Sequence, residues 1–408
     1  MPASPSTARA INDRLALRLL QQEGPLTAGR LKQLTGLSRP SVADLVERLT
    51  LAGLIAVVGE SGEQRRGPNA KVYGIVADQA HLAALDVRLE GVSVVVSDLL
   101  GRVLAEASVP IGPDTGTGSA VEQAVTLVER VVKEAGADRP HTVGIGAPGL
   151  IDPASGELRD STGLPEWHRR LVAALQERFP DARFSVENET NLAALAEQRD
   201  GAARDRDTFV LLWLGMGIGS AVVLDGALRR GANGGAGEIG FLPVPGTSGL
   251  PSATDCDGGF HSLAGAAAVA ALAARHGVPA EAAGSGPATE ALVRAAVGRA
   301  GADPSAERFL DALADRVALG AAAVVSVLDP GCLVLAGEIG RAGGDTLAAR
   351  VQHRLARMSP LPTEVRSSAL GGGAVLRGAL LTARDRAQEE LFAPPGDRPS
   401  DRTRPPGP

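Results

Sequence analysis

The chain has 408 residues and a formal net charge of −6, and its length corresponds to two or three domains. Hydrophobic residues make up 44% and charged residues 22%, which excludes a chain that is disordered throughout. No apolar stretch reaches the roughly 18 residues of a membrane helix, and residues 1–14 lack the apolar core of a signal peptide. Cys256 and Cys332 are the only cysteines, too few for a disulfide framework. We therefore expect a cytoplasmic protein that has no membrane partner.

Charge is distributed unevenly along the sequence. Residues 1–76 contain ten basic and six acidic residues, a net of +4, so the rest of the chain carries −10. A basic head on an acidic body is typical of a nucleic-acid-binding module joined to a separate domain, because neutralising phosphates drives such binding. We therefore treat residues 1–76 as a separate head.

Three helices are expected in the first part of the head. Apolar residues recur on one face of the first helix, which ends at Gly24-Pro25. Thr27 caps a short second helix, and the turn at 35–37 leads into a third helix that Ser38 caps. This spacing is typical of a helix-turn-helix motif.

The third helix has a buried face and a polar face. Apolar residues at i, i+3, i+4 and i+7 bury one face, from Val42 to Leu49. The polar residues on the other face are expected to contact the major groove of double-stranded operator DNA: Ser38, Arg39, Ser41, Asp44 and Arg48.

A basic wing is expected after this helix. Two strands, Leu54–Val58 and Ala70–Val76, are joined by a polar loop that holds Arg65 and Arg66. An arginine pair of this kind suits phosphate or minor-groove contact. The alternative is a three-helix protein-interaction module whose charges are only solvated. The agreement of turn, cap and wing favours DNA binding.

Six ordered segments of the body carry motifs, at residues 85–104, 144–152, 186–194, 215–219, 235–240 and 328–337. With these segments the chain from about Ala80 to Ala387 resembles the ROK family, whose members are bacterial sugar kinases or winged-helix transcriptional regulators. The resemblance implies an α/β fold: a two-lobed, actin-like (RNase H-like) ATPase fold behind an N-terminal winged helix-turn-helix. Two similar strand-turn-strand segments, Leu85–Leu104 and Val210–Leu228, also indicate a duplication.

These observations predict three parts of the chain. Residues 1–76 form the winged helix-turn-helix domain, and residues 80–392 form the ROK domain. Its first lobe takes in about 80–195 and the C-terminal helix 373–392, and its second lobe about 196–372. Residues 393–408 contain six prolines and almost no apolar side chains, which predicts a disordered tail.

Both phosphate loops of the family depart from the kinase pattern. Kinases carry a Gly-Gly-Thr core after an Asp, whereas Asp86 is followed by Val87-Arg88-Leu89-Glu90. Side-chain bulk and the charge of Glu90 oppose close approach of a phosphate. The second loop keeps three glycines within 215–219 but has Met216 where kinases usually have Thr. We therefore expect no kinase activity and no cofactor.

The resemblance also implies a sugar or effector site. Asn188, Glu189 and Glu238 match family positions that bind sugar hydroxyls. His261, which lies in a nearby motif, is expected to line the same sugar or effector site. Glu189 replaces the Asp that serves as the kinase base, and one added methylene shifts the carboxylate by about 1 Å, enough to cost roughly 100-fold in rate. Asn188 could equally cap the helix that follows it, so both roles stay open.

Structural zinc, frequent in the family, is not expected. Phe241 stands in the position of the zinc-binding His, and Cys256 and His261 supply at most two good ligands, whereas a closed zinc site needs four. Cys332 lies among apolar residues and is interpreted as a buried strand residue. The expected metal content is therefore none.

The sequence as a whole favours a DNA-binding regulator, a repressor, that senses a sugar or sugar derivative without phosphorylating it. Because one winged helix contacts only a short half-site, we expect a homodimer or a dimer of dimers. Two alternatives remain: a bifunctional sugar kinase that also binds DNA, and a ligand-independent DNA-binding or scaffold protein with a degenerate cleft.

Overall fold

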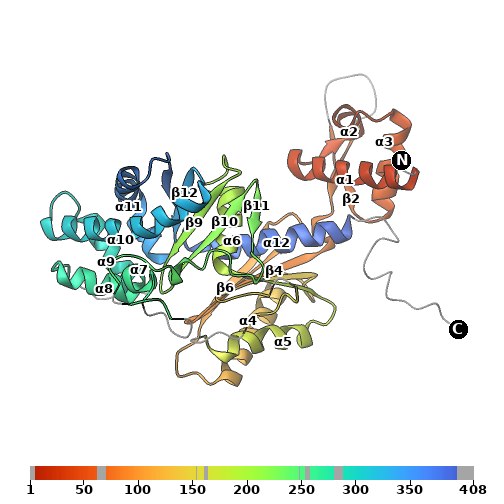
Figure 1. Cartoon of the computed structure of the whole chain (residues 1–408). Coiled ribbons are helices and arrows are strands. Elements are labelled where there is room, and N and C mark those ends of the chain that lie inside the picture. The colour runs from red at the N-terminus through yellow and green to blue at the C-terminus, as the bar shows by residue number, and fades with distance from the viewer. Residues whose placement is uncertain are drawn as a thin grey trace.

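The computed structural model describes residues 5–61, 70–152, 154–159, 164–247, 249–252, 258–279 and 288–392. Arg65, Arg66, Cys256 and the predicted tail 393–408 lie outside the described residues. The described elements form a small N-terminal head beside a larger two-lobed body (Figure 1). Among these residues, no helix is both long and apolar enough to cross a bilayer.

The head is a three-helix unit with a small sheet of order β1-β3-β2. Its elements are α1 (Pro5–Glu23), β1 (Leu26–Thr27), α2 (Ala28–Thr35), α3 (Arg39–Leu51), β2 (Ile55–Ser61) and β3 (Ala70–Ile75). The predicted caps are confirmed, because Thr27 accepts from the N–H of Arg30 and Ser38 from that of Ser41. β1 was not predicted, since its two residues carry no periodicity, and β2 extends past the predicted end at Val58.

The first lobe is built on a five-stranded sheet of order β6-β5-β4-β7-β8. Its strands are β4 (His81–Arg88), β5 (Gly91–Asp98), β6 (Val103–Pro110), β7 (Thr142–Ala147) and β8 (Arg183–Asn188). The β4-β5-β6 strands pair antiparallel, and β7 and β8 join in parallel. Helices α4 (Thr117–Glu134) and α5 (Glu166–Arg178) cover one face and bury an aliphatic core. A short 3-10 turn, η1 (Ala77–Gln79), connects this lobe to the head.

The second lobe repeats this arrangement with the strand order β11-β10-β9-β12-β13. Its strands are β9 (Phe209–Leu214), β10 (Ile218–Leu224), β11 (Ala227–Arg229), β12 (Cys332–Ala336) and β13 (Glu364–Ser367). Its helical elements are η2 (Ile239–Phe241), α7 (His261–Ala264), α8 (Ala266–Arg275), α9 (Ala288–Gly298), α10 (Pro304–Leu328) and α11 (Gly337–Met358). The equivalent strand orders confirm the predicted duplication, and Cys332 is fully buried in β12, as expected.

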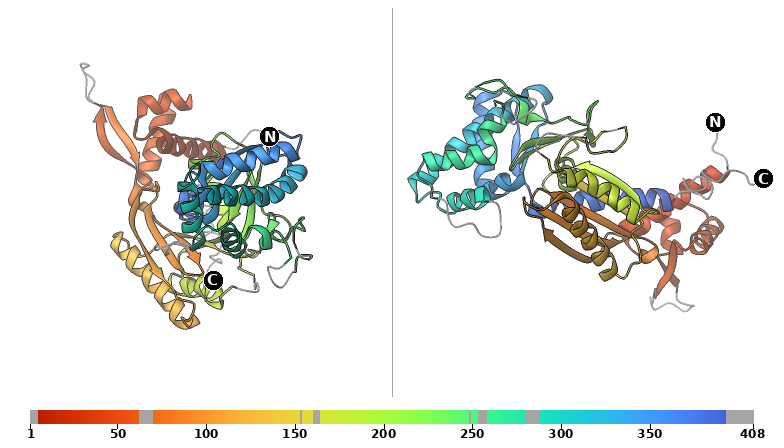
Figure 2. Two further views of the ribbon diagram at one scale, coloured as in Figure 1. Left: turned by 90° about the vertical axis from the view of Figure 1, so that its left-hand side faces the viewer. Right: turned by 90° about the horizontal axis from the view of Figure 1, so that it is seen from below.

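Two helices lie where the lobes meet, α6 (Glu189–Asp200) and α12 (Ala374–Leu391), the latter preceded by η3 (Gly371–Gly373). Both pack closely, because a Cβ at Gly144 would collide with the carbonyl oxygen of Ala379, and one at Gly378 with that of Leu192. A single hydrophobic cluster joins α6 and α12 to the head. Helix α12 also runs from the body toward the head, as Figure 1 and the right-hand view of Figure 2 show.

Candidate functional site

The start of α3 presents polar side chains on the surface of the head. Ser38, Arg39, Ser41 and Asp44 are exposed, while Val42 and Leu45 of the same helix are buried, as the apolar spacing predicts. Within the described residues, the guanidinium of Arg39 has no hydrogen bond or ion pair. A free cation beside a helix N-terminus suits a DNA phosphate or a guanine edge.

Arg48 departs from the expectation of a free, DNA-facing side chain. Its Nη2 donates to Asp13 of α1 at 2.6 Å, and its Nη1 donates to Asp44 one turn earlier in α3. The hydrogen bond to Asp13 raises the pKa of Arg48 further. Arg48 therefore fixes the angle between α1 and α3. Its second hydrogen bond also pairs the carboxylate of Asp44 within the protein. No local pattern predicts the ion pair with Asp13, because Arg48 and Asp13 are 35 positions apart in the chain.

A second cluster lies where the two lobes face each other, and it includes the predicted residues Asn188, Glu189 and Glu238. We call it the interlobe site; it comprises Asp86, Arg88, Glu187, Asn188 and Glu189 of the first lobe, and Trp213, Arg230, Glu238 and Glu338 of the second. The first-lobe residues come from the ends of β4 and β8 and the start of α6, and Glu338 starts α11. The duplicated sheets thus bring residues that are distant in sequence to one place.

Asn188 is the N-cap of α6. Its Oδ1 accepts from the backbone N–H groups of Thr190 and Asn191 at 2.9 and 3.3 Å. Its Nδ2 donates to the carbonyl oxygen of Gly149 at 3.1 Å and to Glu189 at 2.8 Å. Both amide hydrogens and both acceptor positions are therefore in use. The capping role is confirmed, whereas sugar binding by Asn188 stays a prediction.

Glu189 and Glu238 place two carboxyl groups at the interlobe site. Burial raises the pKa of Glu189 to about 8, and the charges of Asp86 and Glu238 add to the effect. At neutral pH the Glu189 carboxyl is therefore mostly protonated and can donate a hydrogen bond to a hydroxyl oxygen. Glu238 remains accessible to solvent, although desolvation by the protein around it raises its pKa too. Together they offer a donor and an acceptor for hydroxyl groups.

Arg88 connects the two lobes. Its Nε donates to Asp86 at 2.9 Å and its Nη1 donates to Glu338 at 2.8 Å. The guanidinium carbon lies 5.9 Å from the ring centroid of Trp213, a cation–π distance. Glu338 in turn covers Gly215, where a Cβ would collide with its carboxylate. The first phosphate-loop segment is therefore linked through Glu338 to the second.

This arrangement does not fit a nucleotide. Asp86, Glu90 and Arg88 line one cavity, and Glu338 adds a third carboxylate over the glycine loop. These carboxylates would repel phosphate oxygens, and the guanidinium of Arg88 is already paired with two of them. Burial raises the pKa of Asp86, whose Oδ1 has no hydrogen-bond partner. Sequence reasoning noted the bulk of Arg88 but missed its partner Glu338, which lies 250 positions away.

A second ion pair joins the lobes. Arg230, after β11, donates to Glu187 at 2.6 Å, and the other carboxylate oxygen of Glu187 accepts from the backbone of Asn188 and the side chain of Asn191. The pair therefore holds the start of α6 against the second lobe. In the sequence, the only sign that Glu187 pairs across the lobes is the position of its carboxylate directly before Asn188.

His261 packs into the second glycine loop. Its Nδ1 accepts from the N–H of Ile218 at 3.0 Å, and its ring meets Phe241 edge-on at 5.4 Å. Burial lowers its pKa, so the imidazole is neutral at pH 7. Phe241 stands at the position where the family resemblance implies a zinc-binding His, and its ring contacts His261. Among the described residues, no group of three metal-binding side chains comes together, and these two residues do not fit a zinc ion.

Comparison with known proteins places these features in context. The family model described as "ROK family" matches residues 83–386, well over half of the chain. A xylose repressor of Caldicellulosiruptor bescii is 26% identical over 244 residues, which cover 58% of this chain and 59% of the repressor. The match thus spans about three fifths of that relative's length.

Solved structures resemble both the whole chain and its body. A ROK family transcriptional regulator, described as a homologue of the Escherichia coli MLC protein, has a TM-score of 0.72 at 21% identity and covers 94% of this chain and 98% of its own. A ROK hexokinase from Thermus thermophilus has a TM-score of 0.60 at 28% identity and covers 76% of this chain and 99% of its own. The first likeness extends the shared fold to the head, and the second is limited to about the length of the body. With its duplicated lobes and its match across residues 83–386, the chain belongs to the ROK family.

Proposed function

We propose that the chain is a sequence-specific DNA-binding transcriptional regulator, a repressor, whose ROK domain binds a sugar or sugar derivative without phosphorylating it. It acts in the cytoplasm on double-stranded operator DNA. Residues 1–76 serve as the DNA-binding domain and residues 80–392 as the sensor. The similarity to a xylose repressor supports a sugar as effector.

The observation that carries this proposal is the Arg88 bridge. In a kinase the two phosphate loops must hold nucleotide phosphates and keep the base in place. Here an internal guanidinium joins Asp86 to Glu338, so the charge that would meet phosphates is neutralised within the protein. The carboxyls of Glu189 and Glu238 remain available for hydroxyl groups.

The position of Glu189 and Glu238 in different lobes suggests how a bound sugar changes DNA binding. A sugar held between Glu189 and Glu238 would contact both lobes and favour one relative position of them. Helix α12 packs on the first lobe and reaches the head, so lobe movement reaches the DNA-binding surface. In a homodimer or dimer of dimers, this changes the distance between two heads and hence the fit to an inverted repeat.

The test is a DNA-binding and turnover assay on the full chain. DNA selected from a random pool is titrated by fluorescence anisotropy with and without each of a panel of sugars, and ADP formation is measured in parallel. The proposal requires tight binding that Arg39→Ala weakens, release by a sugar, and no sugar-dependent ADP. Arg377→Ala is the comparison variant, because Arg377 lies outside the head and its guanidinium is already bound to Asp200.

A bifunctional kinase and DNA-binding regulator is the second candidate. It is favoured by the retained glycines of residues 215–219 and by the likeness to the ROK hexokinase. Sugar-dependent ADP formation at about 1 to 100 per second would establish it. A ligand-independent protein with a degenerate cleft is the third candidate, favoured by the saturated side chain of Asn188. It would show DNA binding that no sugar changes.

A further inference from the structure

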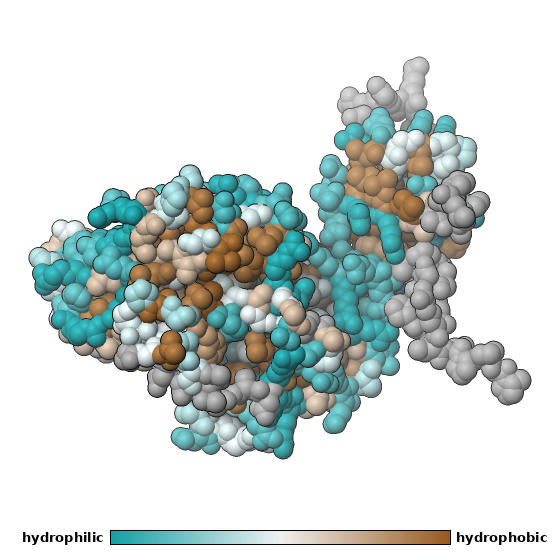
Figure 3. Space-filling view, in the orientation of Figure 1, coloured by the Kyte–Doolittle hydropathy of each residue, from teal (hydrophilic) through white to brown (hydrophobic). Residues whose placement is uncertain are grey.

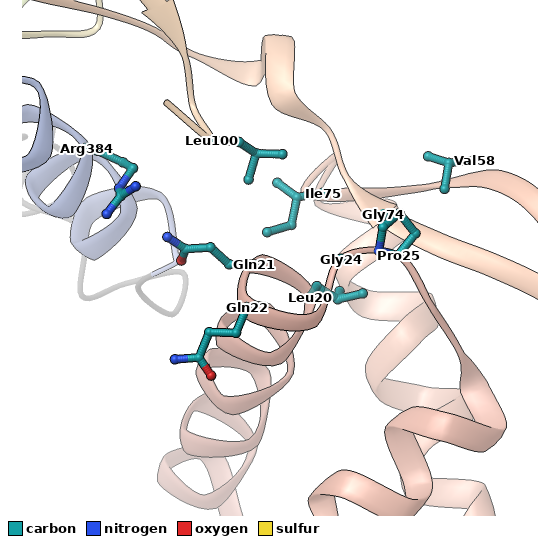
Figure 4. A pocket seen from close by; sticks show the side chains of 10 residues that line it. All are labelled: Leu20, Gln21, Gln22, Gly24, Pro25, Val58, Gly74, Ile75, Leu100 and Arg384. Atoms are coloured by element: carbon teal, nitrogen blue, oxygen red, sulfur yellow. The ribbon is translucent and has the colours of Figure 1, made fainter. Parts of the chain in front are cut away.

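A pocket lies at the junction between head and body, away from the interlobe site. Its volume is about 320 Å³, within the range that holds small ligands. The end of α1, the Gly24-Pro25 turn and the β2-β3 hairpin form the head side, and Leu100 and Arg384 form the body side (Figure 4). Eight of these ten lining residues come from the head and two from the body, so neither part forms the pocket alone.

Among the described residues that line the pocket, Arg384 of α12 is the one that carries a charge. Its side chain is only 15% exposed, and its nearest carboxylate oxygen, on Asp385, is 3.7 Å away. The other oxygen of Asp385 accepts from Arg199 at 2.7 Å. The Nε of Arg384 is buried and has no hydrogen-bond partner, and burial lowers the pKa of this guanidinium. Within the described part of the chain, Arg384 therefore has only this long ion pair, to a carboxylate that it shares with Arg199. Incomplete pairing of a largely buried cation is costly, so a further anion here would be favoured.

The rest of the lining combines free amides with apolar surface. Gln21 and Gln22 have no hydrogen-bond partner among the described residues. Leu20 and Ile75 are buried behind the pocket, whereas Leu100 is 38% exposed at its body side. Exposed hydrophobic side chains also gather on the visible face of the head, shown in brown (Figure 3). The pocket therefore offers a guanidinium fork, amide donors and an apolar wall to one ligand.

The body side of the pocket is rigidly held. The carboxylate of Asp98 accepts from the N–H groups of Leu100 and Arg102 at 3.0 and 2.9 Å. The backbone of Leu99 donates to Ala77 next to the head and accepts from Gln388 of α12. The turn that carries Leu100 is thus fixed to both α12 and the linker before binding, which reduces the entropic cost of holding a ligand.

We propose that this junction pocket binds a small organic carboxylate, with its carboxylate on the guanidinium of Arg384 and its apolar part against Leu20, Ile75 and Leu100. Planar bidentate pairing with Arg suits a carboxylate, and the apolar wall disfavours a fully hydrated inorganic ion. Because the walls come from head and body, the bound ligand would hold the two in one arrangement. Binding needs no DNA; only its consequence for operator affinity rests on the proposed function.

The test is calorimetric titration of the full chain, without DNA, with propionate, hexanoate and 3-phenylpropionate. Each is paired with its neutral amide, and inorganic phosphate is the inorganic control. We expect at least one carboxylate to bind, and its amide to bind about tenfold or more weakly. In Arg384→Gln the carboxylate and its amide should bind with equal affinity. Arg377→Gln is the matched control on the same helix, because Arg377 is paired with Asp200 and should leave the affinity unchanged.

Leu100→Trp provides a second variant that fills the pocket and leaves the charge in place. This variant should lower the affinity for the carboxylate as strongly as Arg384→Gln does. Absence of binding by all three carboxylates at millimolar concentration would overturn the proposal, as would equal affinity for acids and amides. Phosphate binding as tight as that of the best carboxylate would also overturn it. Loss of DNA binding by the same protein would instead count against the proposed function alone.

Discussion

Replacing Arg88 by Met tests whether the ion bridge holds the lobes together. Asp86 and Glu338 have side chains only 5% and 15% exposed, and Arg88 itself is 28% exposed. Removing the guanidinium leaves two carboxylates without their cation, and losing one partner of a buried pair costs about 3–5 kcal/mol. Since Asp86 can take up a proton, as its raised pKa indicates, we expect about 3 kcal/mol, the lower end. Glu338→Gln leaves Arg88 paired with Asp86 and should cost about 1 kcal/mol.

Urea unfolding followed by tryptophan fluorescence measures this cost. The chain has two tryptophans, and Trp213 lies beside Arg88 while Trp167 is buried in the first lobe. In a Trp167→Phe background the signal therefore comes from the bridge itself. A surface substitution ordinarily changes the free energy of unfolding by at most about 0.5 kcal/mol. If the free energy of unfolding of Arg88→Met differs from that of its parent by no more than this, the bridge does not hold the lobes together.

Three further outcomes follow from the structure. Because the folded pKa of Glu189 is raised to about 8 from 4.5, the folded state binds an extra proton between these values, so its stability falls as pH rises through this window. Glu189→Gln should flatten that fall in thermal unfolding, whereas parallel curves for variant and parent would refute the shift. Asp13→Ala should destabilise the head by about 1–3 kcal/mol, seen as faster amide exchange in α1 and α3, because it leaves Arg48 with Asp44 alone; unchanged exchange would contradict this role. Gly378→Ala should lower the melting temperature, because its Cβ would meet the backbone of Leu192; a melting temperature equal to that of the parent would show that the packing yields.

Local signals explain why the head was predictable. The caps at Thr27 and Ser38 and the apolar spacing of α3 act over three or four residues, and the structure has all of them. Strand β1 was not predicted, because two residues are too few to show the alternation of a strand. The duplication was visible because its signals are local too, since each lobe repeats a strand-turn-strand segment with its own Asp/Gly turn, at Asp98–Gly101 and at Asp225-Gly226.

The interlobe site was only partly predictable. Glu189 and Glu238 were found through motifs, but the partners of Arg88 and Arg230 come from other strands and the other lobe. Such pairs depend on how the sheets face each other, which neither periodicity nor spacing encodes. Asn188 illustrates the limit, because its spacing fitted both a cap and a sugar ligand, and only the geometry shows how fully the cap uses its side chain.

The most direct test of the proposed function compares operator release by sugar in the parent chain and in Glu238→Gln. Glu238 is accessible and has no hydrogen-bond partner for its side chain among the described residues, so the substitution should spare the fold. The account predicts that a sugar weakens operator binding of the parent about tenfold or more, that Glu238→Gln binds the same DNA equally well but responds much less, and that neither forms ADP. An equal sugar response in both proteins, or sugar-dependent ADP formation by the parent, would contradict it.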